Sequence, residues 1–247
     1  MTEPKDIKKI VKQKYSQIAQ SGCGCGCSAS QDNSEAIAKS IGYSDQDLAK
    51  AGKTNLGLGC GNPVAFSRIK EGDTVLDLGS GAGVDCLLAA EKVGESGKVI
   101  GVDMTEEMVK LARAAVQEKG LSNVEIILAD IEQLPLPDDS VDIIISNCVI
   151  NLAPDKAKVF QEAKRVLKPG GRMFVSDIVL LAELTAEQRS NEELLAGCVG
   201  GALLKEEYLA IVKQVGLKTK VLSENKDISK QQYGGIALES LLLEAEK

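Results

Sequence analysis

The chain has 247 residues, of which 44% are hydrophobic, and this is enough apolar material for the core of one large domain or of one domain with a small appendage. Its formal net charge of -7 argues against a nucleic acid or a membrane surface as partner, because both are bound through clusters of Lys and Arg. Small molecules are therefore the expected partners.

The N-terminal stretch MTEPKDIKKIVKQKY lacks the apolar centre of a secretory signal peptide. No run of the chain approaches the roughly 18 apolar residues of a membrane span. We therefore expect a cytoplasmic protein. In a reducing compartment seven cysteines do not form a disulfide scaffold, so each is interpreted as buried, ligating or reactive.

The first 62 residues are expected to form a helix followed by a flexible segment rich in Cys and Gly. Apolar residues recur at helical spacing over residues 5–19, which predicts an amphipathic helix that packs against the body of the protein. Residues 20–62 are small, polar and Gly-rich, with one short helix expected at residues 34–41 and the loop NLGLGCGNP at residues 55–63.

From Gly72 onward, β-rich runs alternate with helical patterns. The runs are TVLDL, KVIGVD, VEIILAD, VDIIISNCV and RMFVSDIVL, and the helical patterns cover residues 84–94, 105–119 and 155–168. Such alternation predicts βαβ units and a parallel sheet. The sequence Lys168-Pro169-Gly170-Gly171 is expected to stop the third helix.

The remainder of the chain is expected to complete the same domain. Residues 181–204 are interpreted as an insertion, residues 205–215 as a helix, and residues 218–245 as a closing pair of strands. The predicted fold class is α/β: a Rossmann-like, mostly parallel seven-stranded sheet with helices on both faces. Residues 63–180 form its core, and residues 181–247 form the insertion and the closing elements.

A glycine-rich loop marks the expected ligand site. The sequence VLDLGSGAGVD places Gly79, Gly81 and Gly83 between a predicted strand and a predicted helix, and Asp103 ends the next strand twenty residues after Gly83. Glycines in this position let a ligand approach the backbone, and the carboxylate can bind ribose hydroxyls. Together these features predict a nucleoside-binding site at the carboxyl ends of the strands.

The residue before the loop bears on which ligand binds. Asp77 would repel a pyrophosphate and attract an ammonium group. S-adenosylmethionine has that ammonium group, a ribose and no phosphate, whereas the alternative, a dinucleotide of a Rossmann dehydrogenase, has a pyrophosphate. Asp130 and Ile131 follow the third strand and are expected near the adenine. The expected cofactor-binding set is Asp77, Gly79, Ser80, Gly81, Gly83, Asp103, Met104, Asp130, Ile131 and Asn147. Over roughly residues 70–180 the sequence resembles the class I S-adenosylmethionine-dependent methyltransferases.

Three cysteines are expected to meet at the same edge of the sheet. Cys148 ends the fourth strand in SNCVINL, and two Gly-flanked segments, GLGCGNP with Cys60 and AGCVGGA with Cys198, can reach over the strand ends. Cys86 lies among leucines and is expected in the core. Three thiols in a chain without histidine suit a soft, thiophilic ion. Structural zinc fits poorly, because it normally takes four ligands in closely spaced pairs.

The motifs GLGCGNP, DLGSGAGVD, GVDMTEEM, SNCVINL, RVLKPGGR and AGCVGGAL resemble those of the arsenite S-adenosylmethionine methyltransferases over residues 54–217. The resemblance implies that Cys60, Cys148 and Cys198 bind trivalent arsenic, delivered as arsenite or its thiol conjugates, in a three-sulfur site. It also implies that a further N-terminal cysteine pairs with Cys60 in a redox cycle. We expect glutathione or thioredoxin to reset this cycle.

The N-terminal cysteines depart from the pattern of that family. Adjacent cysteines are usual there, whereas this chain has Cys23, Cys25 and Cys27 on alternate positions. Which of the three acts in the redox cycle stays open, with Cys27 as the working assignment. The segment is interpreted as a flexible thiol supply, and the alternatives are an accessory metal-binding patch or a segment without a role.

The absence of histidine agrees with an arsenic substrate. Methylation of oxygen, nitrogen or an acidic carbon generally requires removal of a proton, often by a positioned base, whereas the arsenic lone pair needs none. Two alternative functions remain: a class I methyltransferase for another small carbon or oxygen acceptor, and a metalloid-binding protein without turnover.

Overall fold

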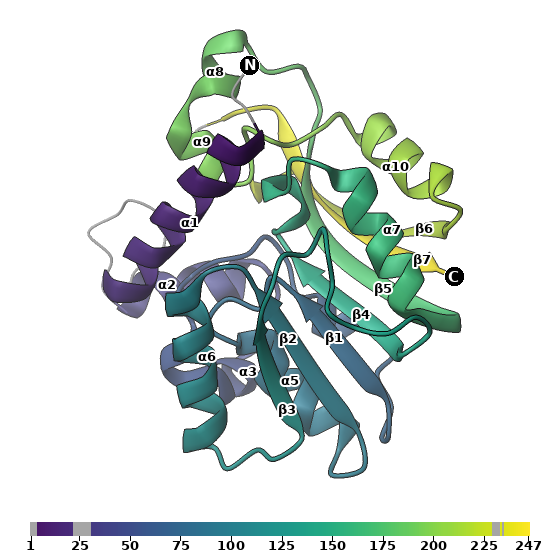
Figure 1. Ribbon diagram of the computed structural model, residues 1–247. Coiled ribbons are helices and arrows are strands. Elements are labelled where there is room, and N and C mark those ends of the chain that lie inside the picture. The colour runs from purple at the N-terminus through teal and green to yellow at the C-terminus, as the bar shows by residue number, and fades with distance from the viewer. Residues whose placement is uncertain (1–3, 22–30, 229–232, 234) are drawn as a thin grey trace.

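A seven-stranded sheet organises the computed structural model, which describes residues 4–21, 31–228, 233 and 235–247 (Figure 1). The strand order is β3-β2-β1-β4-β5-β7-β6, and β7 alone runs antiparallel to its neighbours. The strands are β1 (Thr74–Leu78), β2 (Lys98–Asp103), β3 (Val124–Leu128), β4 (Val141–Asn147), β5 (Leu167–Leu180), β6 (Lys218–Asn225) and β7 (Leu238–Glu246). This confirms the predicted Rossmann-like sheet and its closing antiparallel pair.

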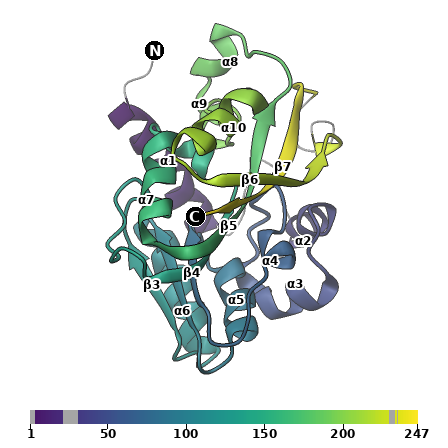
Figure 2. The same cartoon turned by 90° about the vertical axis from the view of Figure 1, so that its right-hand side faces the viewer.

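Helices cover both faces of the sheet (Figure 2). Side chains of α5 and α6 pack into the core on one face, and those of α7 and α10 pack into the core on the other. The helices of the described residues are α1 (Pro4–Ser21), α2 (Gln31–Ser40), α3 (Asp45–Ala51), α4 (Pro63–Phe66), α5 (Val84–Val93), α6 (Glu106–Glu118), α7 (Lys156–Val166), α8 (Ala186–Ser190), α9 (Glu192–Ala196) and α10 (Lys205–Gln214), with short 3-10 turns η1 (Gly52–Thr54) and η2 (Ile150–Leu152).

The order of the strands creates the ligand crevice. β1 pairs in parallel with β2 on one side and with β4 on the other, so the chain changes direction across the sheet at β1. In open α/β sheets, ligands bind at this switch point, outside the carboxyl ends of the strands. β1 is buried along nearly its whole length, Asp77 included, because parallel strands are covered on both faces.

The junction of α7 and β5 differs from the sequence prediction. The helix ends at Val166, and β5 begins at once at Leu167, so Lys168-Pro169-Gly170-Gly171 lies within the strand. A register shift opposite Val141 and Ile143 accommodates these residues, and Gly170 has a φ of 77°. A bulge of this kind absorbs Pro and Gly in a strand, and the sequence pattern alone does not distinguish it from a loop.

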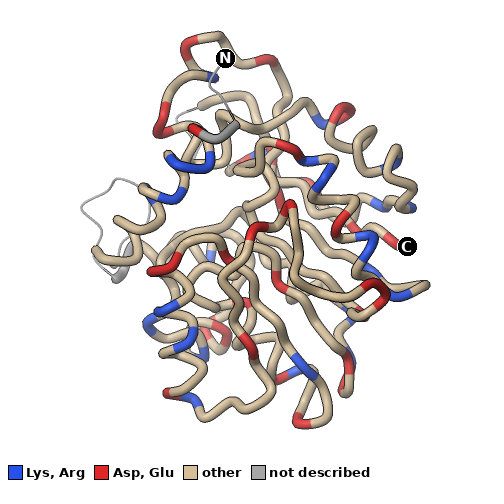
Figure 3. The backbone as a smooth tube through the Cα atoms, viewed as in Figure 1, with Lys and Arg blue, Asp and Glu red and all other residues tan. Residues whose placement is uncertain are grey.

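The predicted N-terminal helix is present as α1, which lies across the strand ends and contacts α6 and α9 (Figure 1). Val11 and Ile18 are buried on its inner side, and the Ser16 hydroxyl donates to Glu107 at 2.7 Å. Over the traced residues Lys and Arg lie among Asp and Glu on many elements (Figure 3). No helix of the described residues is long and apolar enough to cross a membrane.

Candidate active site

A cavity of about 590 Å³ lies at the carboxyl ends of β1, β2 and β4. Its volume is in the range of sites for small molecules and cofactors. Nine of the ten residues of the expected cofactor set line it: Asp77, Gly79, Ser80, Gly81, Asp103, Met104, Asp130, Ile131 and Asn147. Cys148 and Cys198 line the same cavity, so the glycine loop and two thiols face one space.

The glycine loop bends sharply at the floor of the cavity. Gly79 has a φ of 69° and Gly81 a φ of 52°, and the N–H of Gly79 donates to the carbonyl of Val102. A Cβ at Gly79 would lie 2.3 Å from a methyl carbon of Val149, so only glycine fits there, whereas a Cβ at Gly81 would meet open space. The backbone at Gly81 is therefore open to a ligand.

Gly83 is the one member of the expected cofactor set outside the cavity lining. It precedes the first turn of α5 with a φ of 97°, and a Cβ on it would lie 3.2 Å from the Cβ of Ala112. This glycine lets α5 begin close to α6, so its contribution is to packing.

Three buried carboxylates form an acidic wall of the cavity: Asp77, Asp85 and Asp103. Burial raises the pKa of each, to about 6 for Asp85 and well above the usual range for Asp77, whose pKa the charge of Asp85 raises further. The Asp103 carboxylate accepts backbone hydrogen bonds from Gly81 at 3.0 Å and Thr105 at 2.8 Å. Such a wall is suited to a cationic ligand, which would relieve the repulsion among the carboxylates.

A hydrogen-bond network joins the acidic wall to the loop that carries Cys60. The Tyr43 hydroxyl donates to Asp85 at 2.7 Å, and the Asn147 amide donates to Tyr43 at 2.9 Å and to the Gly61 carbonyl at 2.7 Å. The Asn147 carbonyl oxygen accepts from the N–H of Cys60 at 3.1 Å. Asn147 therefore fixes the Cys60 loop to the cofactor side of the cavity.

The opposite rim is held by an ion pair from the N-terminal helix. The Lys8 amine donates to Asp130 and to Glu132, each at 2.6 Å. Lys8 and Ile18 line the cavity from α1, and Asp130 and Ile131 line it from the turn after β3. The helix thus covers the part of the cavity in which the sequence predicts the adenine.

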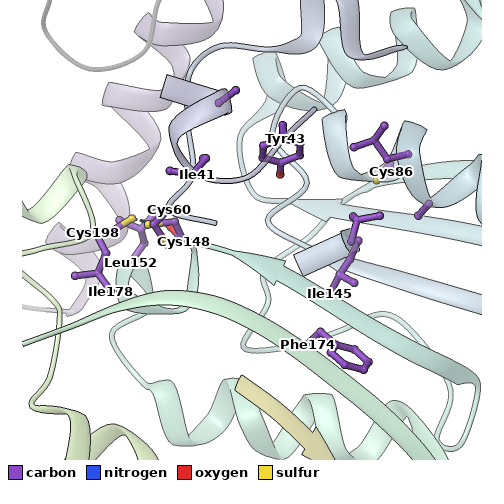
Figure 4. Close-up of a cluster of buried hydrophobic side chains, with 14 of the residues drawn as sticks. Ile41, Tyr43, Cys60, Cys86, Ile145, Cys148, Leu152, Phe174, Ile178 and Cys198 are labelled. Atoms are coloured by element: carbon purple, nitrogen blue, oxygen red, sulfur yellow. Dashed lines mark hydrogen bonds between the residues drawn. The ribbon is translucent and has the colours of Figure 1, made fainter. Parts of the chain in front are cut away.

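Cys60, Cys148 and Cys198 lie together at this end of the sheet (Figure 4). Each is buried, and Cys60, which we expected in a flexible loop, is only 1% exposed. The neighbouring thiols of Cys198 and Cys60, together with burial, raise the pKa of the Cys148 thiol well above the usual range. The Cys198 thiol also donates to the Cys148 carbonyl at 2.6 Å.

The backbone at two of these cysteines is strained. Cys148 has a φ of 58° and Cys198 a φ of 68°, and Asp139 is the only other non-glycine residue with positive φ in the part of the chain that the structure describes. A non-glycine residue in this region costs roughly 1–3 kcal/mol, and such residues cluster at functional sites. The strain therefore marks both cysteines independently of their side-chain chemistry.

Cys86 is separate from the three thiols (Figure 4). It is fully buried on α5, as expected for a core residue, and its thiol donates to Asp77 at 3.3 Å. Cys23, Cys25 and Cys27 lie outside the described residues, so their assignment stays a prediction.

Sequence reasoning missed Asp177, a buried carboxylate beside the thiols. One of its oxygens and the sulfurs of Cys60 and Cys148 all lie within 4.8 Å of one another. Burial raises the Asp177 pKa to about 7, while the nearby Lys156 charge lowers it. Its signal in the sequence was a lone acidic residue within the apolar run RMFVSDIVL. Asp85 and Tyr43 were missed as well, because only tertiary packing brings Tyr43 to the helix that carries Asp85.

Comparison with known proteins gives a consistent family relation. A family model described as a methyltransferase domain matches residues 69–216. An arsenite methyltransferase of Halobacterium salinarum is 43% identical over 228 residues, covering 87% of this chain and 58% of that protein. An arsenite methyltransferase of Homo sapiens is 41% identical over 167 residues, covering 64% of this chain and 44% of that protein.

A solved structure agrees with these relatives. The crystal structure of an arsenic(III) S-adenosylmethionine methyltransferase from Chlamydomonas reinhardtii has 35% sequence identity and a TM-score of 0.65, and the match covers 89% of this chain and 75% of that chain. The present chain spans about half the length of the curated relatives it matches.

Proposed function

The chain belongs to the arsenite methyltransferase family, within the class I S-adenosylmethionine-dependent methyltransferases, and from this premise we propose that it methylates trivalent arsenic. One observation carries the proposal: a single cavity is lined by the glycine loop with its acidic wall and by the thiols of Cys148 and Cys198. Donor and acceptor would therefore meet in one enclosed space.

The acidic wall supports S-adenosylmethionine as the methyl donor. The wall carries Asp77, Asp85 and Asp103, which fit a ligand with positive charges and no phosphate. When bound, S-adenosylmethionine supplies an electrophilic methyl group on a positively charged sulfur. Asp103 stands where it can accept hydrogen bonds from ribose hydroxyls, and the open backbone at Gly81 leaves room for the ligand.

The three thiols support arsenic as the acceptor. Thiolate sulfur is a soft ligand that favours thiophilic ions, and the sequence contains no histidine. Cys60, Cys148 and Cys198 would hold trivalent arsenic as a three-sulfur complex that keeps its lone pair. In the transfer, this lone pair forms the arsenic–carbon bond as the bond between the methyl carbon and sulfur breaks.

Proximity is the main contribution that we assign to the protein in this step. The lone pair is nucleophilic without loss of a proton, so no general base is required for methyl transfer. Holding both reactants in one cavity can lower the barrier by up to about 7–11 kcal/mol. Burial of the thiols, with Cys60 only 1% exposed, would also keep water from the arsenic.

Methyl transfer raises arsenic from the trivalent to the pentavalent state, and two electrons are needed to return it. A pair of cysteine thiols can supply them by closing a disulfide. We assign this step to Cys60 with an N-terminal cysteine, Cys27 in the working assignment, and its reset to glutathione or thioredoxin.

The direct test of this function is product analysis. The protein is incubated with arsenite, S-adenosylmethionine and a thiol, and arsenic species are identified by chromatography with mass detection. Methylated arsenic is expected with the native chain. Cys148→Ser and Cys198→Ser are expected to lower its formation at least about a hundredfold, because serine oxygen is a poor ligand for a soft ion.

Cys86→Ser is the matched control, since it removes a buried thiol outside the three-cysteine group and is expected to keep arsenite binding. Tight arsenite binding without a methylated product would indicate a metalloid-binding protein instead. Turnover of S-adenosylmethionine on another acceptor, with no response to arsenite, would indicate a different small-molecule methyltransferase.

A further inference from the structure

Beside the three thiols lies a carboxylate that the mechanism above does not use. Asp177 on β5 is 1% exposed. Its Oδ1 accepts hydrogen bonds from the Asn151 amide at 2.9 Å and from its neighbour, the Ile178 N–H, at 3.0 Å, and its Oδ2 accepts one from the Tyr208 hydroxyl at 3.1 Å. Three donors on three different groups fix the orientation of this carboxylate.

The position of Asp177 relative to the thiols is specific. Its oxygen and the sulfurs of Cys60 and Cys148 are mutually within 4.8 Å, and among the residues the structure describes this set does not include Cys198. The Cys198 thiol is instead hydrogen-bonded to the carbonyl of Cys148. The carboxylate therefore stands beside two of the thiols while the third thiol is held alongside.

The carboxylate also has acceptor capacity to spare. Two carboxylate oxygens offer about four acceptor positions. Among the described residues Oδ1 receives two donors and Oδ2 receives one, which leaves one position on Oδ2. In a buried site a hydrogen bond to this position is stronger than in water, and a ligand bound beside Asp177 can donate one.

From this geometry we propose that Asp177 binds the remaining hydroxyl group of arsenic held by Cys60 and Cys148, before Cys198 completes the three-sulfur site. The proposal rests on the proposed function and adds an entry step to it.

The entry step balances without a redox change. Arsenite with three hydroxyl groups reacts with the two thiols of Cys60 and Cys148, so two arsenic–sulfur bonds form, two arsenic–oxygen bonds break, and the two thiol protons leave with the hydroxyls as two waters. The third hydroxyl donates its hydrogen bond to Asp177. The Cys198 thiol then forms the third arsenic–sulfur bond, and its proton leaves with that hydroxyl as a third water.

The test uses Cys198→Ser, in which arsenic can form bonds to only two of the three thiols. Arsenic K-edge X-ray absorption of this variant with arsenite is expected to show two sulfur neighbours and one oxygen. Adding Asp177→Asn is expected to raise the arsenite dissociation constant by roughly three- to tenfold, the size expected for loss of one buried hydrogen bond. Adding Asp138→Asn, on a carboxylate that is largely exposed and paired with Arg165, is the matched control and is expected to leave the constant unchanged.

Methylarsenite, as a second ligand, distinguishes loss of the Asp177 hydrogen bond from a general structural effect of the Asp177→Asn substitution. Methylarsenite has two hydroxyls, so it keeps none after binding two thiols, and its affinity for Cys198→Ser is expected to be unaffected by Asp177→Asn. Equal arsenite affinity with and without Asp177→Asn overturns this inference, while methylation by the native chain would leave the proposed function standing. Failure of the native chain to bind arsenite overturns both.

A variant that cannot fold would not bind S-adenosylmethionine, so the binding of S-adenosylmethionine is measured for every variant. If the variant with Asp177→Asn does not bind S-adenosylmethionine, Tyr208→Phe is used instead of Asp177→Asn. Tyr208→Phe removes one donor that orients the carboxylate and keeps the carboxylate itself. In Cys198→Ser it is expected to weaken arsenite binding about threefold, within the range of one neutral hydrogen bond, with methylarsenite binding unchanged. Unchanged arsenite binding in this variant also overturns the inference.

Discussion

At the residue scale, two of the three carboxylates of the acidic wall were predicted from the sequence, and Asp85 was not. Asp77 and Asp103 were predicted because each occupies a defined place at the end of a strand. Asp85 lies in the first turn of α5, and its role depends on Tyr43, which is brought to it from the segment between α2 and α3. No spacing rule links residues 42 positions apart across a loop.

The raised pKa of the Asp85 carboxyl leads us to expect that cofactor binding depends on pH. Burial raises its pKa to about 6, so the carboxyl takes up a proton as the pH falls through 6 and the wall loses a negative charge. The dissociation constant for S-adenosylmethionine is therefore expected to rise roughly fourfold from pH 7.5 to pH 5.5 and to stay flat above pH 7.5. Titration calorimetry across this range measures it.

Asp85→Asn serves as the control for this titration. Its affinity is expected to be weak throughout and to vary less with pH, because the titrating carboxyl is gone. An unaltered pH profile in this variant would assign the dependence to another group. The same raised pKa makes ionised Asp85 unfavourable in the unliganded protein, so its contribution to stability is present at low pH and is lost as the pH rises through 6.

For the three cysteines, the sequence predicts the position of each residue but not its backbone conformation. Their convergence was predicted from strand ends and Gly-flanked segments, and the structure places them together. The left-handed backbone of Cys148 and Cys198 was not predictable, because non-glycine residues adopt it only when surrounding contacts impose it. Asp177 escaped prediction for a related reason: a lone acidic residue in an apolar strand does not reveal its neighbours.

At the scale of elements, the loop that carries Cys60 is fixed by contacts with the sheet. The Ser240 hydroxyl of β7 donates to the Cys60 carbonyl at 2.6 Å, and a Cβ on Gly61 would lie 2.0 Å from the Ser176 hydroxyl oxygen of β5. The position of Cys60 therefore depends on a close approach of backbone to the sheet. The sequence showed the glycines of this loop but not the surface that requires them.

Gly61→Ala is expected to displace this loop and move Cys60 away from Cys148. The arsenite dissociation constant should rise roughly tenfold, because overpacking of this kind costs about 1–3 kcal/mol. Equilibrium binding of arsenite measures the effect. Combining it with Ser176→Ala removes the nearest atom and should recover part of the affinity. Native affinity in Gly61→Ala alone would show that the loop is not constrained by this contact.

Helix α1 was predicted as a docking helix from its apolar periodicity, and the structure adds that it covers the cavity. Ile18 is 5% exposed, lines the cavity and packs with Met108 of α6. Ile18→Ala is expected to loosen the helix, since such a truncation costs about 2–5 kcal/mol of packing. The dissociation rate of S-adenosylmethionine should then rise at least about tenfold, as measured by stopped-flow displacement.

Gln17→Ala is the matched control, because Gln17 is the exposed neighbour of Ile18 on the same helix. It is expected to leave the dissociation rate unchanged. If both variants release S-adenosylmethionine at the native rate, α1 does not retain the cofactor.

At the scale of the whole molecule, the fold was predictable because its pattern is regular. Alternating β-rich and helical segments specified the parallel sheet, and the switch point at β1 then determined where the ligand site lies. Distant segments meet there: the loop before β1, the end of β4 and the insertion after β5 each contribute a cysteine. Chain topology alone predicts this meeting, but it does not give distances.

The N-terminal cysteines are expected to act in the step that returns arsenic to the trivalent state. Replacing Cys23, Cys25 and Cys27 together by serine is expected to preserve the first methyl transfer and to slow repeated turnover, because Cys60 then lacks the partner with which it would form a disulfide to reduce arsenic. Single-turnover and steady-state assays with glutathione separate the two effects. A strong external reductant should restore part of the turnover, and full steady-state activity of the triple variant would refute the proposed thiol supply.

In the proposed function, sulfurs from three remote parts of the chain bind one arsenic atom beside the methyl donor. The most direct measurement is arsenic K-edge X-ray absorption of the native protein with one equivalent of arsenite. We predict three sulfur neighbours in the native protein and loss of one sulfur neighbour in each of Cys60→Ser, Cys148→Ser and Cys198→Ser. An arsenic coordinated only by oxygen, or a count of three sulfurs that no single replacement changes, would contradict the account.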